Sequence, residues 1–122
     1  MQGINRGDIF YADLNGTVGS EQAGIRLVII TQNEVGNKFS STVIVVPLTK
    51  KIGLKIHQPT HYWLRKIGKL KFDSIALTEQ IRVIDKRRLK QKIGVVNDKI
   101  MKEIDKKIII ALGISKGIFS NV

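Results

Sequence analysis

Four polar residues lie close together between two apolar segments of the chain, and their side chains suit chemistry on a phosphate. Ser20, Glu21 and Gln22 stand in a stretch bracketed by two glycines, and Arg26 follows that stretch. A guanidinium binds two phosphate oxygens at once and stays charged, while a carboxylate can accept a proton. A simple connection between two strands requires none of these groups. Composition alone also fits a polar surface loop in which Arg26 forms a salt bridge with Glu21.

A further polar residue, Thr49, ends another apolar segment, residues 43–48. Together with the loop it supplies an anion-binding group, a hydroxyl donor and a candidate base. Chemistry at a phosphodiester requires in-line positioning, transfer of two protons and neutralisation of charge on the phosphoryl oxygens. Arg26 would bind those oxygens, Thr49 would donate to one of them, and Glu21 is the nearest candidate for the base. The alternative for Thr49 is an ordinary hydroxyl at the end of a strand.

Segments with strand composition surround these residues and must position them. They are residues 8–14, 27–31, 42–48 and 58–64, followed by 74–84, which suits one long strand or two joined by a bulge. The continuous apolar run at 27–31 is typical of a strand buried on both faces. Pro47 marks the exit of its strand or an edge position. Residues 33–41 and 65–72 are predicted to be a polar connector and a basic turn.

The C-terminal part predicts one clear helix, from about residue 99 to residue 112, with Asn97 or Asp98 as N-cap and Gly113 at its end. Apolar residues recur every four positions and would share one face: Ile100, Ile104, Ile108 and Leu112. Before this helix, Asp85 is predicted to cap a helical turn at 86–89, and residues 93–96 suit a weak last strand. An amphipathic helix after five to seven strands must pack on a curved sheet. The sequence therefore predicts a mostly β, α+β fold: a small antiparallel barrel with a C-terminal helix.

Length, charge and cysteine content narrow the classes of function. The 122 residues are predicted to form a single domain, residues 1–122. The net charge of +11 is unevenly spread, since residues 1–61 contain 6 Lys and Arg against 4 Asp and Glu, whereas residues 62–122 contain 15 against 6. This excess favours a phosphate backbone as partner, although a lysine-rich solubility surface would give the same balance. Without cysteine, a signal-peptide pattern or a membrane-spanning run, we expect a cytoplasmic protein with no thiolate site and no membrane partner.

Four segments, in order, resemble the MazF/PemK family of toxin endoribonucleases. They read RGDIFYADL at 6–14, GSEQAGIRL at 19–27, VIVVPLT at 43–49 and DSIALTEQIRVID at 73–85. Co-linear motifs over most of a chain are more specific than any one of them. The family usually has proline where this chain has Leu27, and residues 50–71 match poorly.

The resemblance implies an SH3-like barrel of the type shared with CcdB, and a homodimer with RNA across its seam. It also implies a sequence-specific, metal-independent endoribonuclease that cuts single-stranded mRNA without a cofactor, leaving a 2′,3′-cyclic phosphate and a 5′-hydroxyl. Such a toxin pairs with a cognate acidic, MazE-like antitoxin. The implied catalytic residues are Arg26, Thr49 and Glu21, and the implied RNA contacts are Ser20, Gln22, Ser74, Glu79, Gln80 and Arg82.

Two other functions fit the same fold: a CcdB-like toxin that traps gyrase without catalysis, and an RNA-binding barrel that leaves RNA intact. His57 and His61 are interpreted as loop or interface residues. Tyr62 and Trp63 are expected to pack, with base stacking as the alternative. Several basic residues either follow an RNA backbone or remain solvated: Lys69, Lys71, Arg82, Arg87 and Arg88.

Overall fold

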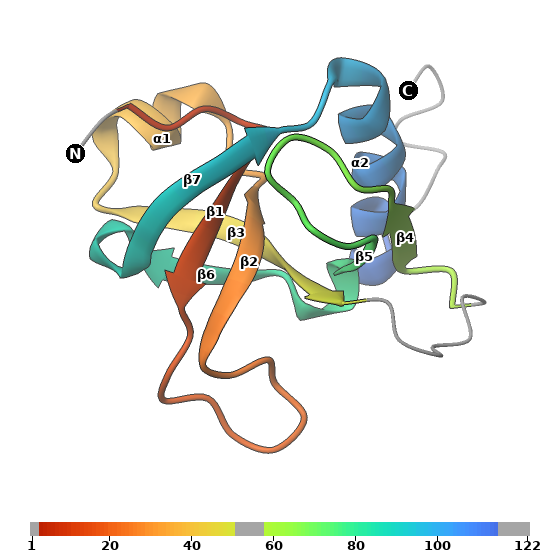
Figure 1. Ribbon diagram of the computed structural model, residues 1–122, viewed down its shortest axis with the longest axis horizontal. Coiled ribbons are helices and arrows are strands. Elements are labelled where there is room, and N and C mark those ends of the chain that lie inside the picture. The colour runs from red at the N-terminus through yellow and green to blue at the C-terminus, as the bar shows by residue number, and fades with distance from the viewer. Residues whose placement is uncertain (1–2, 51–57, 115–122) are drawn as a thin grey trace.

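Seven strands form one antiparallel sheet in the computed structural model, which describes residues 3–50 and 58–114 (Figure 1). The strands are β1 (Asp8–Asp13), β2 (Ile25–Ile30), β3 (Thr42–Lys50), β4 (His61–Leu64), β5 (Ser74–Leu77), β6 (Arg82–Asp85) and β7 (Leu89–Val95). They are hydrogen-bonded in the order β4-β5-β3-β2-β1-β7, and β6 pairs with β3 outside this path. The helices are α1 (Glu34–Phe39) and α2 (Asp98–Leu112), with 3-10 turns η1 (Thr78–Gln80) and η2 (Lys86–Arg88). The predicted α+β class with a C-terminal helix is confirmed.

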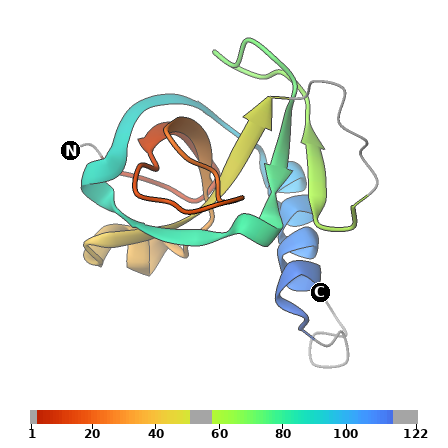
Figure 2. The same cartoon turned by 90° about the horizontal axis from the view of Figure 1, so that it is seen from below.

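The sheet curls strongly but is not closed, so the word barrel describes only its curvature. Within the described residues, β4 and β7 are the two ends of the hydrogen-bonded path and do not pair with each other. Seen from below, the strands wrap around a centre and α2 stands beside them (Figure 2). Leu64 of β4 and Ile93 of β7 both belong to the core cluster that contains Met101 and Ile104 of α2. Apolar packing on the helix therefore takes the place of a closing ladder.

The central strands are buried on both faces, as the apolar run predicts. Val28, Ile29 and Ile30 are each 0% exposed. Ile29 belongs to the cluster under α2, on a face that we call the helix face, together with Val46 and Leu48. Val28 and Ile30 belong to a second cluster, on what we call the inner face, together with Val45. Successive residues of a strand alternate between these faces.

β3 changes partner along one edge, and Pro47 lies at the change. On that edge Val45 is the last residue paired with β6 and Leu48 is the first paired with β5, while the other edge pairs with β2. Proline has no N–H to donate to a ladder. Pro47 therefore occupies a locally unpaired edge position inside the strand, so of its two predicted places the edge position is confirmed and the exit of the strand is wrong. η1 fills the break between β5 and β6, so a 3-10 turn stands where the sequence predicts a continuous strand or a bulge.

α2 forms where the sequence places it, with Asn97 as N-cap. The Asn97 side chain accepts a hydrogen bond from Ile100 N at 2.8 Å, and Gly113 ends the helix with φ 69°. Ile104 is fully buried, but Leu112 is 56% exposed. The predicted stripe is wrong at Leu112 because the core contacts come from residues 100–108. Met101, three residues before Ile104 and 5% exposed, completes the buried face.

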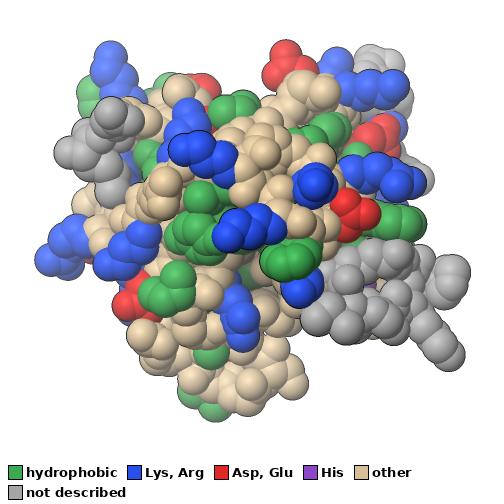
Figure 3. Space-filling model, in the orientation of Figure 1, with side chains coloured by type: hydrophobic (Ala, Val, Ile, Leu, Met, Phe, Trp, Pro, Cys, Tyr) green, Lys and Arg blue, Asp and Glu red, His purple; other side chains and the backbone are tan. Residues whose placement is uncertain are grey.

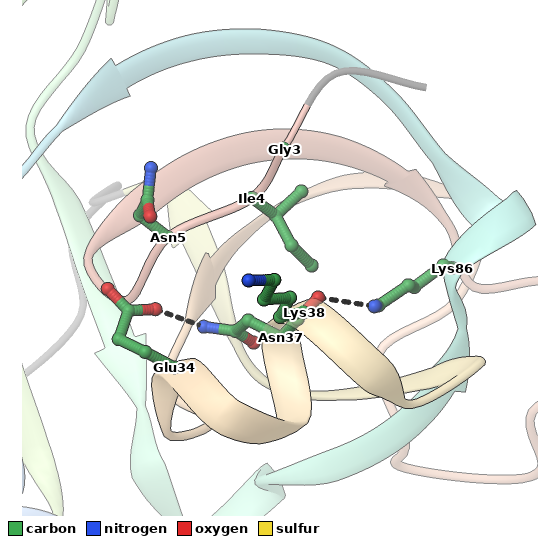
Figure 4. A pocket seen from close by; sticks show the side chains of 7 residues that line it. All are labelled: Gly3, Ile4, Asn5, Glu34, Asn37, Lys38 and Lys86. Atoms are coloured by element: carbon green, nitrogen blue, oxygen red, sulfur yellow. Dashed lines mark hydrogen bonds between the residues drawn. The ribbon is translucent and has the colours of Figure 1, made fainter.

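A short helix, α1, lies where the sequence predicts a polar connector. Asn33 caps it by accepting from Gly36 N at 2.8 Å. The buried Asn37 side chain donates to Glu34 Oε1 at 2.7 Å, and Lys86 donates to the Asn37 carbonyl oxygen (Figure 4). Six residues are too few to show an apolar stripe, so polar composition conceals this helix. In the cavity beside this helix, these hydrogen bonds join Glu34, Asn37 and Lys86.

Asp85 caps the turn that follows β6, as predicted, by accepting from Arg87 N at 2.8 Å. The Arg87 guanidinium, helped by the Arg87 amide, holds the pKa of Asp85 below its ordinary value, and the same pair raises the pKa of Arg87. The turn covers only Lys86–Arg88, because Leu89 already belongs to β7, which is longer than the predicted strand at 93–96. β4 begins at His61, three residues after the start of the predicted strand at 58–64. Residues 58–61 form a turn instead, in which His61 N donates to the Gln58 carbonyl.

Arg6 joins the start of the chain to α2. Its Nη1 donates to Asp105 Oδ2 at 3.0 Å, its Nη2 donates to Asp105 Oδ1, and its Nε donates to the Thr31 carbonyl at 3.0 Å. Paired N–H donors that match both carboxylate oxygens make a strong, directional contact. The guanidinium therefore ties three segments together: the chain start, the end of β2 and α2.

Candidate active site

The connection between β1 and β2 projects from the sheet and carries the polar residues singled out in the sequence (Figure 1). Leu14 N donates to the Gly24 carbonyl at 2.8 Å, which closes the base of the loop. Gly19 and Gly24 have φ of 59° and 77°, a left-handed conformation that other residues rarely adopt. These glycines let the chain turn sharply at both ends of the polar stretch. Glu21 is exposed between them.

Gln80 of η1 holds this loop through two hydrogen bonds. Its Oε1 accepts from Gln22 N at 2.8 Å, and its Nε2 donates to the Ser20 carbonyl at 3.3 Å. Both contacts are to the backbone, so the side chains of Ser20 and Gln22 remain available to a ligand. The resemblance implies an RNA contact for Gln80, and its hydrogen bonds in the structure also position the loop.

A groove of about 550 Å³ lies between the loop and the segment from η1 to β6. Its lining residues are Ser20, Glu21, Gln22, Glu79, Gln80, Ile81, Arg82 and Val83. Six of these are predicted site residues, and they come from two segments about 60 residues apart in the chain. Arg82 Nη1 is buried without a hydrogen-bond partner among the described residues. The groove is therefore lined by one guanidinium, that of Arg82, and by two carboxylates, those of Glu21 and Glu79.

Arg26 and Thr49 lie at the ends of two strands that separate. The ladder between β2 and β3 ends with Val28 opposite Pro47, and beyond it the strands diverge (Figure 1). Arg26 and Thr49 each lie two residues beyond this last pair, and residues two apart in a strand share a face, so both lie on the inner face of the sheet. Neither residue lines the groove, but Arg26 follows directly from the loop that does.

The polar groups of this pair are largely free. Arg26 is exposed, and its Nε donates to the Ala23 carbonyl at 2.8 Å. In the described part of the chain its other guanidinium nitrogens have no protein partner, and Thr49, which is half-buried, uses its hydroxyl in no hydrogen bond. Glu21 and Arg26, both described, form no ion pair, so the simple surface salt bridge is not what the structure contains. These donors are available to a phosphate.

Ser74 is not brought to this groove. It is the first residue of β5, pairs with Lys50 and is only 3% exposed. Since Thr49 and Lys50 are consecutive in β3, Ser74 lies on the helix face, opposite to the face of Thr49. The predicted site residues near the end of β3 therefore lie on two faces of the sheet, Thr49 on the inner face and Ser74 on the helix face.

Glu79 has a partner that sequence reasoning did not identify. His61 Nε2 lies 3.0 Å from Glu79 Oε2, and Thr60 Oγ1 donates to Glu79 Oε1 at 3.0 Å. The structure gives His61 one ordered carboxylate neighbour, because η1 brings Glu79 to the start of β4. No short-range motif links the two residues, so the sequence offers no signal for this pair. His57 lies outside the described residues.

Among residues 3–50 and 58–114, no group of three or more His, Asp or Glu side chains could hold a metal ion. No helix in the same residues is both long and apolar enough to cross a membrane. Lys and Arg far outnumber Asp and Glu over the face seen in Figure 3. Free cationic and hydroxyl donors on a basic surface can bind and polarise a phosphodiester.

Comparison with known proteins identifies the same fold and a family. A family model described as PemK-like, MazF-like toxin of type II toxin-antitoxin system matches residues 5–112. Endoribonuclease MazF from Staphylococcus saprophyticus is 50% identical over 112 residues, covering 91% of this chain and 92% of the relative. The crystal structure of MazF (Form-I) from Deinococcus radiodurans superposes with a TM-score of 0.78 at 18% identity, covering 93% of this chain and 100% of that one.

A mycobacterial endoribonuclease in complex with its cognate antitoxin has a TM-score of 0.73 at 23% identity, covering 90% of this chain and 95% of that chain. At these identities the two structures establish the fold alone. The family model and the half-identical relative cover nearly all of the sequence. Because both span the loop, the groove and the strand ends, the chain belongs to the family of PemK-like, MazF-like toxins of type II toxin–antitoxin systems.

Proposed function

We propose that this toxin is a sequence-specific endoribonuclease that cuts single-stranded mRNA without a metal ion. The ribose 2′-oxygen would bond to the adjacent phosphorus while the bond from phosphorus to the 5′-oxygen breaks. The products would be a 2′,3′-cyclic phosphate and a 5′-hydroxyl. The relative with 50% identity, Endoribonuclease MazF, supports the ribonuclease activity. We place the toxin in the cytoplasm because its proposed substrate is mRNA.

The observation that carries the proposal is that Arg26 and Thr49 each lie two residues beyond Val28 and Pro47, the last pair of the ladder between β2 and β3. Two terminal nitrogens of Arg26 can hold two phosphoryl oxygens, and the Thr49 hydroxyl can donate to one of them. Such donors stabilise the charge that develops on phosphorus in the transition state. They require no metal, because a guanidinium is charged at any physiological pH.

Glu21 is the proposed acceptor of the 2′-hydroxyl proton, and the departing 5′-oxygen takes its proton from solvent. The Glu21 carboxylate is exposed on the same loop that leads into Arg26. Ser20, Gln22, Glu79 and Arg82 are proposed to contact the nucleotides beside the cut, since they line the groove. Ser74 is proposed to contact RNA on the helix face.

Two protein partners belong to the proposal. The first is a second copy of the chain, with the RNA across the seam. The second is an acidic, MazE-like antitoxin, which the toxin–antitoxin family and the shared fold with MazF in the MazE–MazF structure (Form-II) from Deinococcus radiodurans support. An excess of 15 basic over 6 acidic residues at 62–122 suits an acidic partner.

The decisive experiment incubates the purified protein with one long single-stranded RNA in excess EDTA. We expect discrete cuts at a short recurring sequence, with cyclic phosphate ends detected by mass spectrometry. Uncut RNA together with trapped gyrase would instead support a CcdB-like toxin. Bound but intact RNA would support a non-catalytic barrel.

A further inference from the structure

We propose that the helix face carries a second RNA-binding surface, which holds nucleotides flanking the cut site. This surface, the aromatic–lysine patch, consists of Tyr11, Lys50, Lys69, Lys71 and Phe72. The inference rests on the proposed ribonuclease function and adds to it a site for the substrate outside the groove.

The patch surrounds a small cavity of about 80 Å³. Lys50 Nζ lies 3.6 Å from the centre of the Phe72 ring, yet Phe72 remains 50% exposed and Tyr11 38% exposed. Leu48 and Leu70, which are 2% and 4% exposed, form an apolar floor. The two aromatic side chains are thus fixed at their bases and open at the surface.

The chemistry of the patch matches single-stranded RNA. Aromatic rings stack unpaired bases whatever their sequence, and lysine ammonium groups neutralise the phosphates between those bases. Three lysines line the cavity, and its lining contains no Asp or Glu. An acidic peptide would also pair with the lysines, but exposed rings beside cations are better suited to bases.

The position of the patch connects it to the catalytic pair. Leu27, which lines the cavity, follows Arg26, and Lys50 follows Thr49. Consecutive strand residues point to opposite faces, so the patch lies directly behind Arg26 and Thr49. Since the ladder between β2 and β3 ends at Val28 and Pro47, a single strand of RNA that leaves the cut site can turn around the separated strand ends. It then meets Lys50 and Phe72 first.

The test compares two RNA substrates of one sequence: a minimal RNA containing only the cut site, and one extended by several nucleotides on both sides. For the variant Phe72→Ala, we expect KM for the extended RNA to rise about tenfold, as for loss of one stacked base. KM for the minimal RNA and kcat for both should stay as in the unmodified protein. Phe72→Tyr should restore the lower KM. In the variant Lys69→Ala/Lys71→Ala, the salt dependence of binding to extended RNA should weaken, by a slope of about 0.7 for each lost phosphate contact.

Phe39→Ala is the matched control. Phe39 is 75% exposed, and Lys38 Nζ lies 5.4 Å from its ring centre, but the pair stands on α1 outside the patch. It should change neither KM. Equal KM values for Phe72→Ala and the unmodified protein on both RNAs would overturn the inference, as would an equal rise on both. An unmodified protein that cuts neither RNA would instead refute the proposed function.

The same variants distinguish RNA from two other possible ligands of the aromatic–lysine patch, an antitoxin peptide and a second copy of the chain. If Phe72→Ala weakens inhibition by an acidic antitoxin peptide but leaves RNA binding unchanged, the patch binds protein, and the RNA inference fails. If Phe72→Ala changes the molar mass in light scattering, the patch is an interface between copies, and the inference fails equally.

Discussion

The Gln80 side chain and the Gln22 backbone amide are joined by a 2.8 Å hydrogen bond across 58 residues of sequence. Gln80 belongs to η1, which occupies the break where β3 changes partner at Pro47. The exposed loop that carries Glu21 is therefore held by η1 as well as by the hydrogen bond between its own ends.

Removing this contact should loosen the loop without unfolding the protein. In Gln80→Ala we expect RNA cleavage to fall about tenfold, because a misplaced catalytic group loses most of its advantage. Amide exchange at Gln22 should accelerate, which NMR can measure. Gln91→Ala, at an exposed position of β7, serves as control. Faster exchange with unchanged cleavage would show that the position of the loop does not limit the reaction.

Arg26→Ala and Thr49→Ala should each reduce the cleavage rate on the order of a hundredfold or more, because each removes one donor to the phosphoryl oxygens. The circular dichroism spectrum and the melting temperature should stay close to those of the unmodified protein. Arg87→Ala removes an arginine whose side chain is 91% exposed and should leave the rate unchanged. Cleavage by either active-site variant near the normal rate would remove that residue from the site.

A substrate with a 2′-deoxy sugar at the cut position should resist cleavage, whereas the same sugar elsewhere should not matter. The reason is that the attacking oxygen is missing. Gel electrophoresis of end-labelled RNA, in the presence of EDTA, measures the cleavage of both substrates. Cutting of the deoxy substrate would show that water, and not the 2′-hydroxyl, attacks phosphorus.

Arg6→Ala should lower the free energy of unfolding by about 1–3 kcal/mol, because it removes charged hydrogen bonds to Asp105. Arg6→Lys should recover only part of this, since one ammonium cannot match both carboxylate oxygens. Urea denaturation of Arg6→Ala, Asp105→Ala and the double variant gives the coupling between them. Additive losses would mean that the two side chains stabilise the fold independently.

Inhibition by the acidic antitoxin should weaken as salt rises from low to moderate concentration, because screening shortens the reach of exposed charge pairs. Apolar anchors on the antitoxin should retain part of the affinity. Titration of the antitoxin against the toxin at each salt concentration, with the rate of RNA cleavage as the readout, measures the loss of inhibition. Cleavage that continues in the saturated complex would place the antitoxin away from the RNA groove.

The sequence was sufficient where a local pattern determines the structure. α2 begins after Asn97 and ends at Gly113, as the cap preferences of these residues predict. The apolar run around Ile29 is buried on both faces. The glycines at 19 and 24 turn the loop because only glycine takes that backbone conformation at low cost.

Features that depend on distant partners could not be read in this way. The pair of His61 and Glu79 requires η1 to fold back over β4, and no spacing rule encodes that contact. The placement of Ser74 away from Thr49 follows from strand register, which turns every side chain to the opposite face when it shifts by one residue. α1 was concealed because its stability comes from Asn33, Asn37 and Lys86 rather than from an apolar stripe.

Arg6 and Asp105 are 99 residues apart, so a chain still being synthesised cannot join them until α2 has left the ribosome. Ile104, which shares the core cluster of Ile9 and Ile29, arrives equally late. Contacts between such distant residues form only after the intervening chain is available. The toxin therefore completes this part of its fold only after residue 105 has left the ribosome, long after β1 and β2 have been made.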